Sequence, residues 1–272
     1  MADACLSRRG LSLRHEGRHE VSRTLPEELP VAMVFDGTTQ AVMMATPADL
    51  EDFALGFALT EGFIDHPGQV AEFEIAEHAE GMEARFWLSE DRGAALAARR
   101  RSMAGPVGCG LCGIDSLAAA MRPLPRLPEA GATFSRAGVA GATGALRAHQ
   151  PLHDRTHAVH AAGFMTPDGS LALAREDVGR HNALDKLVGA LARAGRAASG
   201  GAFVITSRVS VEMVQKTVIA GAPLLIAVSA PTAHALRLAE EAGLTLAAFA
   251  REGGFDLYSH PHRILDGDPH VA

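Results

Sequence analysis

Apolar residues in the second half of the chain recur at spacings that alternate between the strand period and the helix period. Short apolar runs at 202–206, 224–229 and 244–250 predict buried strands. Helix-period segments at 209–220 and 231–242 lie between them, and each ends at a glycine, a common helix terminator. Strand–helix–strand–helix–strand with short connections predicts parallel βαβ units.

Other segments flank these units. Apolar runs at 158–165 and 170–175, separated by Thr-Pro-Asp-Gly, predict a hairpin, and 182–194 predicts a helix that ends at Gly195. Residues 255–258 predict a last strand.

The first half is less regular. Alternating residues at 31–44 around Asp-Gly predict a hairpin, and residues 70–88 weakly predict further strands. A helix is expected to start with Thr46 as its N-cap and Pro47 at its first position, and to end at Gly62. The first twenty-odd residues are polar and without pattern, so we expect a loose arm that leads into an edge strand.

Composition narrows the class of protein. The chain has 272 residues, of which 47% are hydrophobic and 21% charged, typical of a soluble globular protein. Its net charge of −7 argues against a general nucleic-acid binder, which needs a basic surface. No apolar stretch has the length of a signal peptide or a membrane span, and three cysteines do not make an extracellular disulfide framework. We expect a cytoplasmic protein that binds neither membrane nor nucleic acid.

The chemistry most worth testing is a glycine-rich stretch that carries two cysteines. Cys109 and Cys112 are two residues apart, and Gly108, Gly110 and Gly113 flank them. Glycines permit unusual backbone conformations, so the segment predicts a loop that presents thiols. A Cys-x-x-Cys pair can form half a zinc site, cycle as a disulfide, or use a thiolate to accept and pass on sulfur. The pattern alone leaves these three uses open.

A second candidate site follows the predicted parallel strands. Residues 206–210 and 229–232 are rich in hydroxyl groups, and each leads into a helix N-terminus. Ligands of such sheets bind beyond the carboxyl ends of the strands, and helix N-termini bind phosphate. We therefore expect a phosphate-bearing ligand at this edge.

A third candidate is a dense run of titratable groups from Arg175 to Asn182, followed by Asp185 and Lys186. A capped helix start would explain Asp177 or Asn182, but not Arg180, His181, Asp185 and Lys186 together. We favour a functional cluster, because convergent ionisable groups near strand ends often mark sites. Glu212 and Lys216, by contrast, are explained as an i,i+4 pair on one helix.

Zinc-dependent deaminase chemistry does not fit the histidines. Such enzymes place a His-x-Glu before a Cys-x-x-Cys, with the glutamate as general acid and base. Here the cysteines come first and Ala161-Ala162 follows His160. The order of these motifs and the missing glutamate after His157 and His160 therefore argue against catalytic zinc. We expect His160 to be a hydrogen-bonded core residue. A structural zinc site and a dithiol redox couple remain as alternative functions.

Taken together, the motifs resemble one family. Gly-Cys-Gly-Leu-Cys-Gly, the run from Glu176 to Lys186, the run from Ser207 to Lys216 and Ser229-Ala-Pro-Thr232 are similar to those of the formate dehydrogenase accessory sulfurtransferases, as is Thr46–Phe57. The resemblance covers residues 25–260. One departure is Thr156-His-Ala-Val-His160, where the family usually has Thr-Gly-Gly-x-His.

The resemblance implies a function. Family members accept persulfide sulfur from a cysteine desulfurase and deliver it to the molybdenum cofactor, bis-molybdopterin guanine dinucleotide, before the cofactor enters formate dehydrogenase. It implies that Cys109 carries the persulfide, with Cys112 beside it, and that members form homodimers. The implied cofactor segment comprises Phe249, Ala250, Arg251, Glu252, Gly253 and Gly254. From the residues themselves we add the groups at the strand ends and helix starts, whose charges and hydroxyls suit the phosphate oxygens of a dinucleotide: Arg180, His181, Arg208, Ser210, Ser229 and Thr232.

The resemblance also implies a fold. It is an α/β (α+β) architecture with a cytidine-deaminase-like three-layer core around a mixed sheet, and a smaller β-rich N-terminal subdomain. Three prolines between Pro123 and Pro128 predict a linker. We accordingly expect an N-terminal subdomain at 1–125, which includes the cysteine loop, and a C-terminal subdomain at 126–272.

Overall fold

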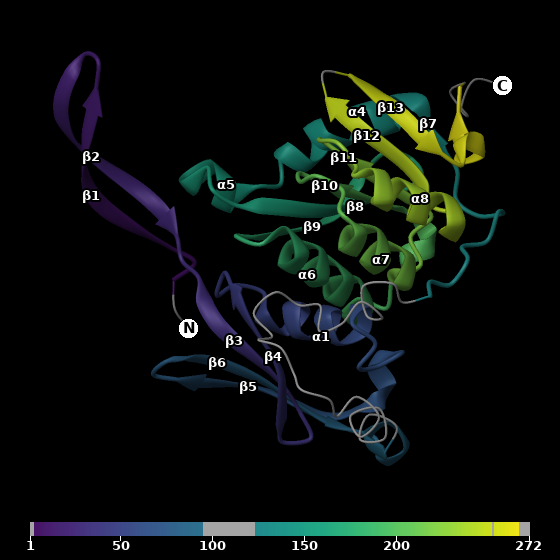
Figure 1. Ribbon diagram of the computed structural model, residues 1–272, viewed down its shortest axis with the longest axis horizontal. Helices are drawn as coiled ribbons and strands as arrows, with labels where there is room; N and C mark the ends of the chain where they lie inside the picture. The colour runs from purple at the N-terminus through teal and green to yellow at the C-terminus, as the bar shows by residue number, and fades with distance from the viewer. Residues whose placement is uncertain (1–2, 95–122, 252, 267–272) are drawn as a thin grey trace.

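The computed structural model describes residues 3–94, 123–251 and 253–266. Its elements form a stack of layers, in which a four-stranded sheet, helix α1, a set of helices, a six-stranded sheet and helix α4 follow one another (Figure 1). An α/β fold with a mixed sheet is thereby confirmed. The likeness to cytidine deaminases in detail stays a prediction.

The six-stranded sheet has the order β13-β12-β11-β10-β8-β9. Its centre consists of β10 (Ala202–Ile205), β11 (Leu224–Ala227) and β12 (Thr245–Arg251), which pair in parallel. Helices α7 (Val211–Ala220) and α8 (Ala233–Ala242) connect them, so the βαβ units are confirmed. Gly221 and Gly243 end the two helices with φ of 86° and 76°, values that glycine adopts without a Cβ clash.

Antiparallel strands complete this sheet on both sides. β8 (His160–Met165) pairs with β10 and with β9 (Leu171–Asp177), which is the predicted hairpin, and β13 (Gly254–Ser259) pairs with β12. Helix α6 (Arg180–Arg193) follows β9 directly. The sheet is therefore mixed, as expected.

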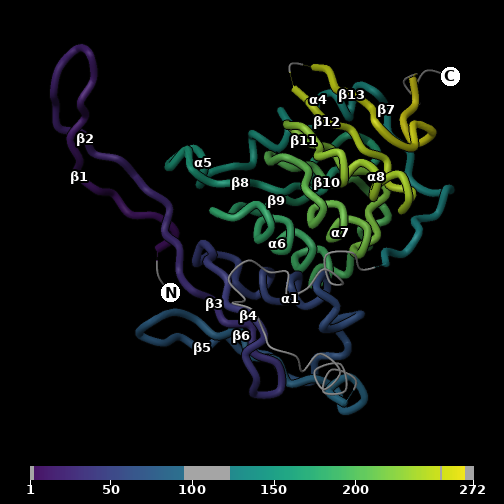
Figure 2. The backbone as a smooth tube through the Cα atoms, in the orientation of Figure 1, coloured from purple at the N-terminus to yellow at the C-terminus, as the bar shows by residue number. Residues whose placement is uncertain are grey.

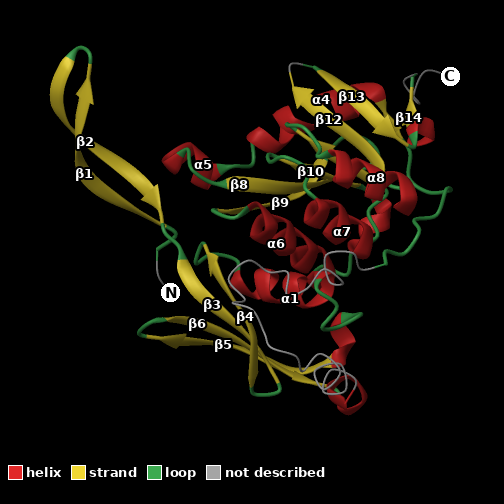
Figure 3. Cartoon of the chain, viewed as in Figure 1, coloured by secondary structure: helices red, strands yellow, loops and turns green. Residues whose placement is uncertain are grey.

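Each face of this sheet has its own apolar core. Helices α6, α7 and α8 cover one face through residues such as Leu184, Val214 and Ala239. Helix α4 (Arg136–Arg147) covers the other face through Val139, Ala142 and Leu146. Figure 3 shows these helices on opposite sides of the strands. The sequence periodicity predicts neither α4 nor the short helix α5 (Pro151–Thr156), so the structure adds both helices to the predicted elements.

The four-stranded sheet has the order β4-β3-β6-β5 and contains β3 (Leu29–Phe35), β4 (Thr38–Ala45), β5 (Val70–His78) and β6 (Gly81–Leu88). The hairpin at 31–44 and the weakly predicted strands at 70–88 are thus confirmed. Helix α1 (Leu50–Thr60) packs Phe53 and Phe57 on one face of this sheet.

Helix α1 lies between the four-stranded sheet and helix α6 (Figure 1). The two helices touch at Gly56 and Gly189. A Cβ on Gly56 would lie 1.8 Å from the carbonyl oxygen of Asp185, and one on Gly189 would lie 1.9 Å from that of Asp52. Only glycine permits this backbone-to-backbone approach.

Two expectations about the N-terminal part are wrong. The first residues form a hairpin of β1 (Cys5–Arg14) and β2 (Gly17–Pro26) instead of a loose arm. Helix α1 starts at Leu50, with Asp49 as its N-cap, because Thr46 is buried in contacts with β9 and α6.

Short elements complete the described residues. They are the 3-10 turns η1 (Pro67–Gln69), η2 (Ala198–Gly200) and η3 (Pro261–Arg263), and a small parallel pair of β7 (Phe134–Ser135) and β14 (Ile264–Leu265). Among the described residues, no helix is both long and apolar enough to span a bilayer. The domain boundary near residue 125 stays a prediction.

Candidate functional site

A pocket of about 700 Å³ lies at the carboxyl ends of β10, β11 and β12, on the face covered by α4. The strand ends contribute Thr206, Val228, Ala250 and Arg251. The beginning of β8 contributes Val159 and His160, and α4 with the segment after it contributes Ala140, Gly141, Thr143, Gly144, Arg147, Gln150 and His153. The pocket therefore occupies the edge that the βαβ pattern predicts for a ligand.

Helix α4 turns its smallest residues toward this pocket. A Cβ on Gly141 or Gly144 would meet no atom within 4 Å, so both glycines border open space. Thr143 donates its hydroxyl to the carbonyl of Ala250 at 2.8 Å, which ties the helix to the end of β12. The small side chains keep the cavity open while this bond fixes its wall.

His160 lies at the entrance to β8, where its Nδ1 is 3.3 Å from the hydroxyl of Thr206. That hydroxyl also accepts the backbone N–H of Ala161 at 3.0 Å. Partial burial, reinforced by the charge of Arg180, lowers the pKa of His160 below its usual range. The expected hydrogen bond of His160 is confirmed, but its place in the core is wrong: the side chain is only partly buried and lines the pocket, where it can form a hydrogen bond with a ligand.

The position of His153 depends on Glu176. The carboxylate of Glu176 accepts the backbone N–H groups of Leu152 and His153, both at 2.8 Å, at the start of α5. Partial burial raises the pKa of Glu176 despite these two bonds. The contact anchors α5 to β9 beside the pocket.

The predicted cofactor segment reaches the pocket in part. Ala250, Arg251 and Gly253 line it, and the exposed Arg251 side chain supplies a cation at its rim. Phe249 is 36% exposed and has a φ of 51°, at a break in the pairing of β12 with β13. Gly254 begins β13, and Glu252 lies outside the described residues.

The other predicted ligand residues do not line this pocket. Ser210 and Thr232 are the N-caps of α7 and α8, on the opposite face of the sheet, and the hydroxyl of Thr232 accepts the N–H of Ala235. The carbonyl of Ser229 accepts the N–H of Phe249 at 3.5 Å. Their role toward a ligand stays a prediction, as does that of Arg208 beside them.

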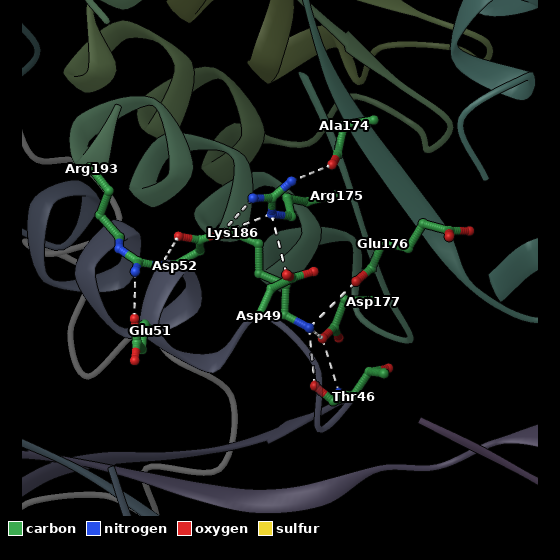
Figure 4. Close-up of polar contacts among 10 residues, drawn as sticks. All are labelled: Thr46, Asp49, Glu51, Asp52, Ala174, Arg175, Glu176, Asp177, Lys186 and Arg193. Carbon is green, nitrogen blue, oxygen red and sulfur yellow. Dashed lines mark hydrogen bonds and ion pairs between the residues drawn. The ribbon is translucent and has the colours of Figure 1, made fainter. Parts of the chain in front are cut away.

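The titratable run after β9 divides into a buried part and a partly exposed part. Asp177 and Lys186 are fully buried and form an ion pair of 2.7 Å (Figure 4). Asp177 accepts the backbone N–H of Thr46, and Lys186 donates to the carbonyl of Thr46. These two residues join the start of α6 to the segment before α1, so packing explains them.

A second buried ion pair involves Asp185, the residue of α6 directly before Lys186. Asp185 binds Lys216 of α7 at 2.9 Å and accepts the hydroxyl of Thr60, and Lys216 also binds Glu61 at 2.6 Å. Burial raises the pKa of Asp185 to about 6. Burial alone would lower the pKa of Lys216, but Asp185 and Glu61 raise it above its usual range. The explanation of Lys216 as an i,i+4 partner of Glu212 is therefore wrong.

Asp52 of α1 provides a third contact between the same layers. It accepts Arg175 from β9 and Arg193 from α6, both at 2.8 Å (Figure 4). Arg193 also pairs with Glu51. The carboxylates of Asp52, Asp177 and Asp185 thus connect α1 and the segments on either side of it to β9, α6 and α7.

Arg180 and His181 occupy the partly exposed end of the run, at the start of α6. Burial lowers the pKa of His181 to about 4, with further contributions from Arg180 and Lys216. Within the described residues, its Nε2 has no hydrogen-bond partner. A neutral imidazole with an unused ring nitrogen is compatible with a ligand contact, and this prediction stays untested.

Cys109 and Cys112 lie outside the described residues, so their use also stays a prediction. Cys5, the third cysteine, is buried at the base of β1.

Comparison with known proteins connects these features. Residues 26–265 match the model of the FdhD/NarQ family. A sulfur carrier protein FdhD of Brucella abortus is 53% identical over 256 residues, which cover 94% of this chain and 95% of the relative. One from Agrobacterium fabrum is 49% identical over 243 residues, 89% of this chain and 90% of the relative.

A solved structure also resembles the chain. A crystal structure from Desulfotalea psychrophila, assigned as a formate dehydrogenase accessory protein, gives a TM-score of 0.77 at 24% identity. The alignment covers 97% of this chain and 100% of the chain in the crystal structure. At this identity the likeness bears on the fold alone.

Proposed function

The chain belongs to the FdhD/NarQ family, and on that basis we propose that it is a sulfur carrier required for formate dehydrogenase activity. The observation that carries the proposal is the similarity over nearly the whole chain to relatives named sulfur carrier protein FdhD. The Gly-Cys-Gly-Leu-Cys-Gly stretch supplies the chemistry that such a carrier needs.

In the proposed reaction, the Cys109 thiolate attacks the terminal sulfur of a cysteine desulfurase persulfide. The new S–S bond forms on Cys109 as the S–S bond of the donor breaks, and the donor cysteine leaves as a thiolate, so no net oxidation occurs. Cys109 then passes the terminal sulfur to the reduced molybdenum cofactor: the S–S bond of the persulfide breaks, Cys109 leaves as a thiolate, and the reduced metal supplies the two electrons that convert the sulfane sulfur to a sulfide ligand. This transfer would make the protein a sulfurtransferase.

The pocket supports the proposed acceptor, bis-molybdopterin guanine dinucleotide, as a bound substrate. Its volume is in the range of small-molecule sites. His160 and Thr206 offer hydrogen bonds to the edge of a heterocycle, and Arg147 and Arg251 offer charge to phosphate oxygens. Cations that converge locally allow an acidic protein to bind an anionic ligand.

Sulfur loading tests the first half of the proposal. We expect the intact mass to rise by one sulfur after incubation with a desulfurase and cysteine, and to stay unchanged for Cys109→Ser. Cys112→Ser is the matched control and should still load, because the leading cysteine is the proposed carrier. Loading that depends on Cys112 and not on Cys109 would reverse the assignment.

The alternatives for the cysteine pair give different results. Stoichiometric zinc that is lost in both cysteine variants would favour a structural metal site. Two thiols that disappear together after mild oxidation, without any sulfur loading, would favour a redox couple.

Ligand binding tests the second half. We expect guanosine diphosphate, a fragment of the cofactor, to bind in calorimetry, and Gly144→Leu to abolish binding by filling the pocket. Ala137→Leu, on the same helix but outside the pocket lining, is the control and should bind normally. Equal binding by both variants would place the nucleotide elsewhere.

A further inference from the structure

One buried amide in the wall of the pocket has no partner in the part of the chain that the structure describes. Gln150 lies between α4 and α5, is 3% exposed and lines the pocket. Figure 2 shows the chain at this point, where α5 leads into the start of β8. The Gln150 carboxamide forms no hydrogen bond within residues 3–94, 123–251 and 253–266. Burial of an unpaired amide is unfavourable, which indicates that a bound ligand completes its hydrogen bonds.

The position of Gln150 in the chain would ordinarily give its side chain a structural role. It is the N-cap of α5, and an N-cap side chain commonly accepts the backbone N–H of the second or third helical residue. In α5 these residues are Leu152 and His153. Both donate their backbone N–H groups to the carboxylate of Glu176 instead, at 2.8 Å. Glu176 of β9 therefore caps α5, and the Gln150 carboxamide is left to face the pocket.

Other polar side chains of the pocket wall are engaged within the protein. Thr143 donates to a backbone carbonyl, Thr206 contacts His160 and a backbone N–H, and Arg147 forms an ion pair. Gln150 differs from them, because its carboxamide offers an acceptor oxygen and a donor NH₂ side by side. This pair suits the edge of a flat ring that carries the complementary donor and acceptor.

We propose that Gln150 determines the specificity of the pocket for a heterocycle with an amide edge, in which a ring N–H lies beside a ring carbonyl. The carboxamide oxygen accepts the ring N–H, and the carboxamide NH₂ donates to the ring carbonyl. Guanine carries this edge, and so does the pterin ring of the same dinucleotide. The inference rests on the proposed function, since it assigns a recognition group for the acceptor proposed above.

Selectivity follows from the burial of the amide. A ligand without the amide edge leaves Gln150 unpaired in the complex, and a site built to hydrogen-bond its ligand rejects analogues that lack the bonding groups. An apolar side chain of similar length would bind both kinds of ligand alike. Methionine is such a side chain, because it is unbranched and flexible like glutamine.

Calorimetry of the full chain with two nucleotides tests the inference. The probes are guanosine diphosphate and 2-aminopurine riboside diphosphate, which has the same phosphates but lacks the ring carbonyl and the ring N–H. We expect the wild type to prefer guanosine diphosphate by about tenfold or more. Gln150→Met should lose most of this preference, because it weakens the binding of guanosine diphosphate alone. Gln40→Met makes the same change on the four-stranded sheet and should keep the preference.

A pterin probe shows which of the two rings contacts Gln150. If the guanine ring does, Gln150→Met weakens the binding of guanosine diphosphate and leaves that of 6-carboxypterin unchanged. If the pterin ring does, the reverse holds. Either result supports the inference.

The melting temperature without ligand provides a second measurement. Gln150→Met replaces an unpaired buried amide with an apolar group, so it should not lower the melting temperature. A structural role of the amide within the protein would lower it, and this result would overturn the inference.

Two binding results would also overturn the inference. One is that Gln150→Met leaves the affinities for guanosine diphosphate and 6-carboxypterin both unchanged, and the other is that it weakens both nucleotides by the same factor. In either case, loss of nucleotide binding in Gly144→Leu would leave the proposed function standing. A wild type that binds neither ring would contradict the proposed acceptor and, with it, the role of Gln150.

Discussion

The two faces of the six-stranded sheet use the same residue type for opposite purposes. On the face that bears α6, Gly56 and Gly189 bring two helices into backbone contact, and a Cβ at either would lie within 2 Å of a carbonyl oxygen. On the face that bears α4, Gly141 and Gly144 border a cavity where a Cβ would touch nothing. Helix glycines thus close one interface and open the other.

Ionisable groups differ between the two faces in the same way. On the α6 side, Asp177, Lys186, Asp185 and Lys216 are buried and paired with each other. On the α4 side, His160 and Arg251 border the pocket. A dense cluster of charges in the sequence marks a site only where the fold leaves space beside it.

The largest expected effect comes from breaking the buried pair. Lys186→Ala leaves the carboxylate of Asp177 buried without its counter-charge, so we expect a loss of about 3–5 kcal/mol in the free energy of unfolding, measured with denaturant. Asp177→Asn/Lys186→Met, which removes both charges, should recover part of this loss. A cost below about 1 kcal/mol for the single change would contradict the importance of the pair.

A smaller effect concerns pH. The pKa of His181 is about 4 in the folded protein and near 6.5 in the unfolded chain, so the unfolded state binds more protons between these values. Folding stability therefore falls as pH falls from 6.5 to 4, by roughly 2–3 kcal/mol from this residue.

His181→Gln isolates that contribution. The raised pKa of Asp185 gives stability an opposite slope over a similar range, but it is present in both proteins and cancels in their difference. We expect the variant to gain stability relative to the wild type as pH falls from 7 to 4. Parallel pH profiles of the two proteins would contradict the burial of a neutral His181.

The glycines themselves give the next contrast. Gly56→Ala forces α1 and α6 apart, and we expect a loss of about 1–3 kcal/mol, measured by denaturant unfolding. The same substitution in α4, Gly144→Ala, meets open space. A gain in stability at both positions would show that helix propensity, and not the interface, determines the effect.

The smallest effect has the opposite sign. Gly144→Ala should raise the free energy of unfolding by about 0.5–1 kcal/mol, because alanine loses less conformational freedom than glycine in a helix. A rise of a few degrees in melting temperature would accompany it. Destabilisation would mean that α4 packs more closely at this point than the cavity indicates.

Sequence periodicity predicted the central strands and their helices because each buries a continuous apolar stripe. It missed α4, whose Ala- and Gly-rich sequence dilutes the helical spacing of Val139, Ala142 and Leu146. It also missed β1 and β2, whose exposed side chains carry no burial pattern.

The site was predicted in part for a similar reason. Residues at the carboxyl ends of parallel strands, such as Thr206 and Arg251, meet at one edge by topology. The partner of Lys216 could not be predicted, since Asp185 lies on a different helix and the two approach only through packing. The small residues of α4 gave no chemical signal, although they form one wall of the pocket.

The hydrogen bond between Thr60 and Asp185 connects residues that are 125 positions apart. At a synthesis rate of about 5–20 residues per second, a ribosome takes roughly 6–25 s to add the partner after Thr60 is made. During that interval α1 lacks the helix that covers its second face. The acidic first third of the nascent chain must therefore remain soluble until α6 emerges, and its excess of carboxylates serves that need before any partner arrives.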